Sequence, residues 1–178
     1  MATFPRSMGA NKLYIKKGDR NSPLDYTGVL ATGEAAKAGI AMSINGAGKL
    51  VAGLTASSLP FFAMSGTDIN NAPDVVRERG MPYAGEGRFG TLCGLMSCEL
   101  STTGFDATAA YPVGTLLTAV AVAAVDPTIR GVLRPTALAT DIVVGVVSAD
   151  AVGSEDGYPT LSFYPRFIPG TTVPASLA

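Results

Sequence analysis

The chain has no histidine and no tryptophan, and two of its 178 residues are cysteines. Without histidine, nucleophilic catalysis by a Ser-His or Cys-His pair is excluded, because no imidazole is present to act as the general base. The two cysteines, Cys93 and Cys98, are too few to build a zinc site without histidine ligands or a second cysteine pair. We expect both to be reduced thiols in a partly buried segment.

Charged residues are scarce as well. They form 15% of the chain and the net charge at pH 7 is −1, whereas about a quarter of the residues are charged in a typical soluble domain. A nearly neutral chain has no bulk electrostatic attraction to nucleic acid or to an anionic membrane. A surface with few charges is typical of a protein that partners partly cover.

Long apolar runs are also missing. No run approaches the ~20 residues of a membrane-spanning helix, and residues 1–20 lack the apolar region of a secretory signal. The sequence therefore predicts no membrane association and synthesis in the cytosol.

What the chain does contain is a series of short apolar runs separated by glycine, proline and aspartate, with 21 Gly and 12 Pro in all. Between Tyr111 and Phe167 these runs read YPVGTLLTAV, RGVLRP, DIVVGVVS and YPTLSFYPRF. Runs of this length, rich in Val, Ile, Leu, Thr and aromatic residues, are typical of strands. We expect a mainly β protein, a compact antiparallel β-barrel or β-sandwich with a long loop insertion and an extended N-terminal arm.

Side-chain alternation assigns two faces to the last of these runs. Leu161, Phe163 and Phe167 share one face of a strand, and we expect that face to lie in the core. Tyr164 and Arg166 lie on the other face. The neighbouring prolines favour an edge strand at a protein interface.

A weak internal repeat is present. The strand-like runs of residues 38–66 (AGIAMSI, GKLVAGL, PFFAMSG) resemble those of residues 113–148 in their order. The first copy contains Asn45-Gly46, a strong β-hairpin signal. Two similar strand groups can pair into one sandwich or barrel.

Changes in amino-acid composition along the sequence suggest how the chain is divided. We expect residues 29–170 to form a single β domain with a loop-rich insertion at 66–104, in which residues 91–100 can form one more strand pair. Residues 1–28 are expected to be an extended N-terminal arm, and residues 171–178 a C-terminal tail.

The arm combines basic and apolar side chains, namely Lys12, Tyr14, Ile15, Lys16 and Lys17. One interpretation is a solvated terminus. The other is a basic arm that reaches onto a neighbouring subunit with Tyr14 and Ile15 as anchors, since purely disordered segments are poor in such residues.

Motifs of catalysis are weak in this chain. The run GEGRFG at 85–90 has the spacing G-x-G-x-x-G, but a turn-like stretch precedes it and no helix start follows it, as a dinucleotide site would require. Most acidic residues stand beside turn residues, where they accept local backbone hydrogen bonds. We predict a protein that is not an enzyme and that has no catalytic residues, no cofactor and no metal.

The order of elements from Tyr111 to Phe167 carries a family likeness. A glycine turn enters a strand (PVGTLL), and a loop leads to GVLRP, to DIVVGVVS, to an acidic turn (GSEDG) and to TLSFYPRF. This order, and above all DIVVGVVS with Gly145 between pairs of valines, resembles the capsid decoration, or cement, proteins of tailed bacteriophages.

The resemblance implies a structural virion protein on the outer capsid surface, synthesised in the host cytoplasm. Such a protein binds the assembled phage head, stabilises contacts between major capsid protein subunits and self-associates, here as an expected homotrimer, without nucleic acid or membrane. The candidate partner-binding residues are Lys12, Tyr14, Ile15, Lys16, Lys17, Tyr164 and Arg166.

Two alternatives stay open at this point. One is another small virion component, such as a head fibre, an adaptor or a tail-tube subunit. The other is a carbohydrate-binding or adhesion β module, although the chain lacks tryptophan, the usual residue for stacking on sugars.

Overall fold

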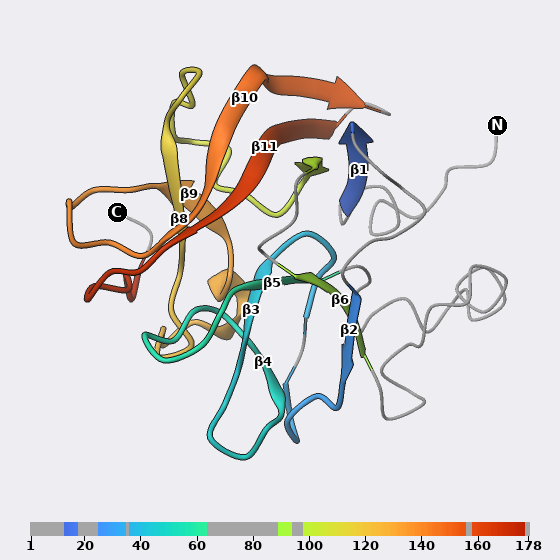
Figure 1. The fold of residues 1–178 in the computed structure, drawn as a ribbon, viewed down its shortest axis with the longest axis vertical. Coiled ribbons are helices and arrows are strands. Elements are labelled where there is room, and N and C mark those ends of the chain that lie inside the picture. The colour runs from blue at the N-terminus through green and yellow to red at the C-terminus, as the bar shows by residue number, and fades with distance from the viewer. Residues whose placement is uncertain are drawn as a thin grey trace, which may run out of the picture.

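A computed structural model describes residues 13–17, 25–34, 36–63, 89–93, 98–155 and 158–176. This described part is mainly β and forms eleven strands in two antiparallel sheets (Figure 1). The six-stranded sheet contains, in spatial order, β1 (Leu13–Lys17), β7 (Glu99–Thr102), β11 (Tyr158–Ile168), β10 (Val143–Glu155), β8 (Leu116–Ala119) and β9 (Leu133–Pro135). The five-stranded sheet contains β2 (Asp25–Gly28), β6 (Phe89–Cys93), β5 (Phe61–Ala63), β3 (Ala41–Ile44) and β4 (Leu50–Ala52).

The predicted fold class is confirmed, and the architecture is that of a sandwich. Within the described residues no hydrogen-bonded ladder closes the sheets into a barrel; an isolated bridge between Leu54 and Ala121 links them instead. A short 3-10 helix, η3 (Pro127–Ile129), lies between β8 and β9. The Asp126 carboxylate caps this helix by accepting a hydrogen bond of 2.8 Å from the Thr128 backbone N–H.

The two sheets share one strand order. The five-stranded sheet runs β2-β6-β5-β3-β4, and the other runs β7-β11-β10-β8-β9 once β1 is set aside. Each strand of the first series therefore has its counterpart five strands later in the chain. The chain thus consists of two units with the same topology, β2–β6 and β7–β11, and one additional strand, β1.

The stretches with similar sequences occupy equivalent places in these units. Residues 38–66 contain β3 to β5, and residues 113–148 contain β8, β9 and the first half of β10. Gly39 and Gly114 precede the first strand of each stretch, and their φ angles are 90° and 85°. Both lie in the left-handed region, which favours glycine.

The hairpin predicted at Asn45-Gly46 is confirmed. Strands β3 and β4 pair with Ile44 opposite Leu50. The connection is longer than a two-residue turn, and the Asn45 side chain closes it by accepting hydrogen bonds of 3.0 Å from the backbone N–H groups of Ala47 and Lys49.

The main core lies between the sheets. Phe62 on β5 and Phe163 on β11 are fully buried, and their rings meet edge to face with centroids 5.2 Å apart. The other buried members come from both sheets and from the loops that join them: Ala41, Leu54, Cys98, Leu100, Phe105, Tyr111, Leu117, Ala119, Leu133, Ile142, Val144, Val147 and Leu161.

A second apolar cluster covers the other face of the five-stranded sheet. Successive residues of a strand point to opposite faces, so Phe61 and Met42 point away from their neighbours Phe62 and Ala41 in the main core. The cluster also contains Ala36, Ile40, Leu50, Ala52 and Ala63. Strands β3, β4 and β5 are therefore buried on both faces, which explains why they read as nearly uninterrupted apolar runs.

The segments outside the expected β body also supply strands. Residues 13–17 and 25–28, within the predicted arm, form β1 at the edge of one sheet and β2 at the edge of the other. The predicted insertion at 66–104 supplies β6 and β7. Each lies inside a sheet, and because the sheets differ, residues 91–100 do not form the expected strand pair.

The predicted tail is described up to residue 176, and it lies against the body. Thr172 accepts a hydrogen bond of 3.0 Å from the backbone N–H of Ile142, and the Pro174 carbonyl accepts one of 2.7 Å from Ala121. The side chain of Val173 packs against the main core. The tail thus links the loop that follows β8 to the loop that precedes β10 by backbone hydrogen bonds.

The absence of a side chain at residue 145 is required by the core. A Cβ atom on Gly145 would lie 2.7 Å from Cδ2 of Phe163 and 3.2 Å from the carbonyl oxygen of Tyr164. We predict that Gly145→Ala lowers the free energy of unfolding by about 1–3 kcal/mol, because the buried ring has to leave its packed position. Urea unfolding measures this difference.

Gly46→Ala is the matched control. A Cβ atom on Gly46 meets nothing within 4 Å, so we expect a change within about 0.5 kcal/mol. Equal unfolding midpoints for the two variants would show that the ring of Phe163 does not require this space.

Candidate protein-interaction site

Strand β11 presents one buried and one exposed face, as its alternation predicted. Leu161 and Phe163 are fully buried, whereas Tyr164 is 47% exposed, and Arg166 and Ile168 are exposed as well. The assignment of the two faces is therefore confirmed.

The expectation of an edge strand was wrong, since β11 lies between β7 and β10. Pro165 is tolerated inside the sheet because it stands opposite Gly145, next to the point where the β10–β11 register shifts between Val143 and Gly145. Irregular pairing of this kind accommodates a residue that has no backbone N–H to donate.

A strip of exposed apolar side chains crosses the outer face of the six-stranded sheet. Val146 on β10 is paired with Tyr164 on one side and with Leu116 on the other, so the three residues form a row across three strands. Directly opposed residues of antiparallel strands point to the same face. Leu116 is 40% exposed, and Val113 in the preceding turn is 65% exposed.

Two polar side chains beside this strip make no hydrogen bond or ion pair with the described part of the protein. Among the described residues, neither the Tyr164 hydroxyl nor the Arg166 guanidinium has a hydrogen-bond or ion-pair partner. Tyrosine and arginine next to apolar side chains are the composition that dominates binding energy at protein interfaces. Because Tyr164 and Arg166 lie beside exposed apolar side chains, we take this strip as the candidate protein-interaction site.

The predicted arm residues lie at the other end of the same sheet. In β1, Tyr14 pairs with Ser101 and Ile15 with Leu100 of β7, and the register shifts between Ile15 and Lys17. Lys12 lies outside the described residues. Nζ of Lys16 donates a hydrogen bond of 3.3 Å to Oγ of Ser162 on β11. The side chain of Lys16 therefore reaches strand β11, whereas Ile15 stands in register with Leu100, which pairs with the buried Phe163.

The residue that holds the two lysines was not anticipated from the sequence. Glu99 on β7 is 1% exposed, and its carboxylate lies 3.2 Å from Nζ of Lys17 and 3.9 Å from Nζ of Lys16. Ser148 on β10 donates a hydrogen bond of 2.7 Å to the same carboxylate. The motif CEL gives no local sign that its acid is buried, because the burial results from strands far away in the chain.

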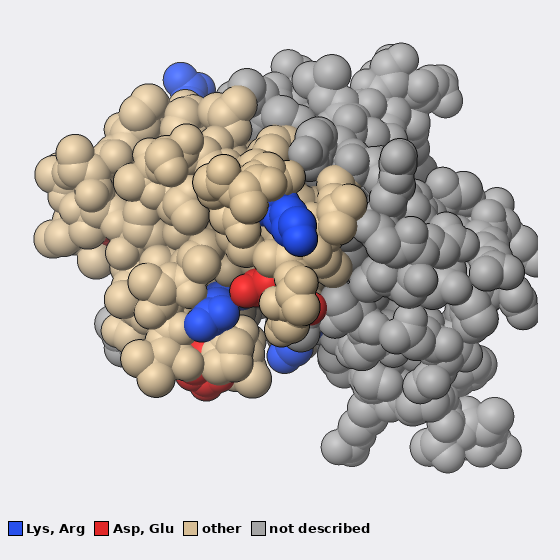
Figure 2. Space-filling view, turned by 90° about the horizontal axis from the view of Figure 1, so that it is seen from below, with Lys and Arg blue, Asp and Glu red and all other residues tan. Residues whose placement is uncertain are grey.

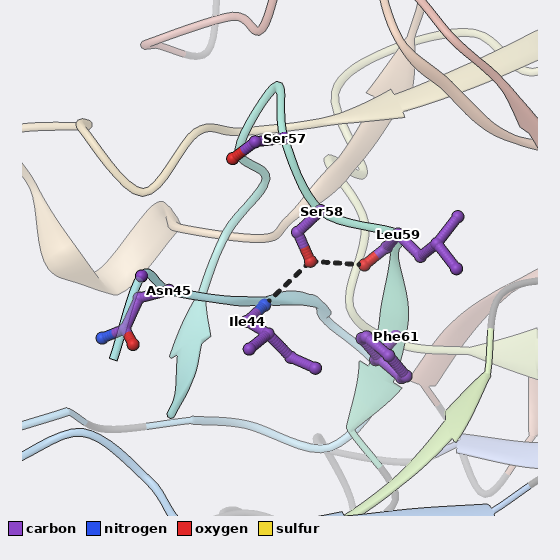
Figure 3. A pocket seen from close by; sticks show the side chains of 7 residues that line it. Ile44, Asn45, Ser57, Ser58, Leu59 and Phe61 are labelled. Atoms are coloured by element: carbon purple, nitrogen blue, oxygen red, sulfur yellow. Dashed lines mark hydrogen bonds between the residues drawn. The ribbon is translucent and has the colours of Figure 1, made fainter. Parts of the chain in front are cut away.

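A hollow of about 410 Å³ lies beside the β3–β4 hairpin. Ile44, Leu59, Phe61 and small polar residues line it (Figure 3). The Ser58 hydroxyl accepts a hydrogen bond from the Ile44 backbone N–H and donates one to the Leu59 carbonyl. Its polar group is therefore used to fix the loop, and no pair of acid and base side chains converges there.

Two candidate nucleophiles near this sheet, Ser162 and Cys98, are buried. Ser162 beside Lys16 is 3% exposed, too deeply buried to meet a substrate. Burial raises the pKa of the Cys98 thiol above its ordinary value, so the thiolate is disfavoured at neutral pH. Within the described residues, no three of the side chains Cys, Asp and Glu gather as metal ligands would.

Two searches concern the chain as a whole. No helix of the described part is long and apolar enough to cross a bilayer. Comparison of the chain with protein-family models, with curated proteins and with solved structures finds no match. The function therefore has to be inferred from the surface itself.

Phe163 and Tyr164 are adjacent in β11 and point to opposite faces, so substituting each in turn tests the assignment of the two faces. We predict that Phe163→Ala lowers the free energy of unfolding by about 3–5 kcal/mol, because it empties the centre of the core. Tyr164→Ala is expected to change it by less than about 0.5 kcal/mol, since the ring is exposed. Chemical denaturation of both variants measures the difference, and a large loss at Tyr164 would assign that ring to the core.

Proposed function

We propose that this chain is a structural protein of a tailed bacteriophage that binds the outer surface of the assembled head. It stabilises contacts between major capsid protein subunits and acts as a homotrimer. The observation that carries the proposal is the row of Leu116, Val146 and Tyr164 across three strands, with the exposed Arg166 beside it. A rigid sheet face of this composition favours a large protein surface as its partner.

The sparse charge of the molecule supports the same proposal. On the face that Figure 2 shows, most of the described surface is uncharged, and most of its charged side chains lie in the centre and lower part of the view. Binding to such a surface stabilises whichever state of the partner presents the complete binding site. A protein that binds only the assembled shell therefore stabilises the shell by its binding free energy, with no chemical step.

The test is cosedimentation with expanded heads that are assembled from the major capsid protein of the same phage and lack this protein. We predict that wild-type protein sediments with the heads. Tyr164→Ala combined with Arg166→Ala is expected to weaken binding at least about tenfold, because each residue type is a frequent hot spot.

Val125→Ser is the control, because Val125 is 97% exposed in the loop after β8 and lies outside the strip. Equal binding by the double variant and the control would place the capsid-binding surface elsewhere on the protein. If wild-type protein does not bind heads, the proposed function is wrong. Binding to isolated tails or to a carbohydrate in a parallel assay would then support one of the alternatives.

A further inference from the structure

Strand β1 stands outside the internal repeat. The units β2–β6 and β7–β11 have the same strand order, and each has it without β1. The strand lies at the edge of the six-stranded sheet, where it pairs with β7, while the next strand in the chain, β2, belongs to the other sheet. Within the described residues, therefore, no hairpin ties β1 to a neighbour in sequence, and seven residues, 18–24, separate it from β2 along the chain.

The body holds a preformed binding site for this strand. The site consists of the buried Glu99 carboxylate on β7, the Ser148 hydroxyl on β10 and the Ser162 hydroxyl on β11. The ammonium groups of Lys16 and Lys17 form ion pairs with the Glu99 carboxylate in this site. Consecutive residues of a regular strand point to opposite faces, and the bulge between Ile15 and Lys17 allows both lysines to reach one carboxylate.

The buried Glu99 carboxylate requires positively charged partners in this site. Without β1, the Glu99 carboxylate would keep its Ser148 donor and lose both cationic partners, and a buried carboxylate without a counter-charge is strongly unfavourable. The partly buried side chain of Leu13, which packs against the main core, would be lost as well. Any strand that supplies the same lysines and the same apolar residue satisfies the site equally well.

We propose that β1 is exchanged between copies of this chain. The β1 strand of one copy pairs with β7 of a neighbouring copy, and its Lys16 and Lys17 bind the neighbour's Glu99. The contacts are identical within one copy and between two copies, so exchange costs no contact, and holding copies close together raises the share of exchanged strands. The inference concerns copies of this chain alone and does not depend on the proposed function.

A disulfide placed across the β1–β7 pair distinguishes the two arrangements. Tyr14 and Ser101 are directly opposed, and opposed residues of antiparallel strands have Cα atoms about 4.5–5.5 Å apart, within reach of a disulfide. The variant carries Tyr14→Cys and Ser101→Cys, with Cys93→Ala and Cys98→Ala to remove the native thiols. After oxidation at high protein concentration we expect covalent dimers and larger species on denaturing, non-reducing gels.

The split form of this experiment gives an unambiguous sign of exchange. One copy carries Tyr14→Cys, the other carries Ser101→Cys, and the two are folded together. A disulfide between these residues can then form only between copies, and we expect it. A double variant that yields monomers with an internal disulfide, together with no cross-link in the split experiment, would overturn the proposal.

Charge reversal provides a second measurement with the native cysteines in place. Lys16→Glu with Lys17→Glu reverses the charge of strand β1, and Glu99→Lys reverses the charge of the site that binds it. Light scattering is expected to show that each variant alone loses the oligomer, whereas the two folded together form dimers or larger even-numbered oligomers, in which every strand meets an opposite charge in its partner. One chain with all three substitutions controls for folding.

Wild-type protein that stays monomeric at all concentrations would overturn the proposal. A co-folded mixture that keeps the masses of its separate components would do the same, provided that the triple variant folds.

Discussion

The apolar layer between the two sheets is the constraint on which the rest of the molecule depends. Phe62 comes from the first unit and Phe163 from the second, and their contact joins the two. Because a strand alternates, the burial of Phe163 between the sheets directs Tyr164 to the outer face. The candidate interaction surface is thus a consequence of core packing, and its rigidity comes from the same source.

The outer face of the six-stranded sheet combines two environments. Toward β8 and β10 it carries exposed apolar side chains, of which Leu116 is an example. Toward β1 and β7 it carries buried polar groups, including Glu99, Ser101 and Ser162. The first environment suits contact with a separate protein. The second selects a strand with positive charges, because its carboxylate is withdrawn from water.

Local features of the fold were predictable from the sequence, because they depend on residues close together in the chain. The alternation at 161–168 gave both faces of β11, and Asn45 marked the β3–β4 hairpin. The similarity of residues 38–66 and 113–148 pointed to two related strand groups, and the shared strand order of the two sheets gives that similarity a structural counterpart.

Features that depend on distant pairing were not predictable. Adjacent runs at 89–93 and 99–102 join different sheets, and β11 lies inside its sheet despite its prolines. Glu99 reads in sequence as an ordinary surface acid. Its role arises from Lys17 and Ser148, which lie 82 (99 − 17) and 49 (148 − 99) positions away. Of the candidate site, alternation identified Tyr164 and Arg166, whereas the partners of the lysines required the folded sheet.

The division of the core between the two units has a consequence for synthesis on the ribosome. Phe163 follows Phe62 by 101 positions (163 − 62), and at roughly 5–20 residues per second the second ring is made several seconds after the first. During that interval the layer that covers the inner face of the five-stranded sheet is incomplete. A nascent chain that stops before β11 therefore displays an apolar sheet to its surroundings, so rapid completion of each chain protects the protein from aggregation.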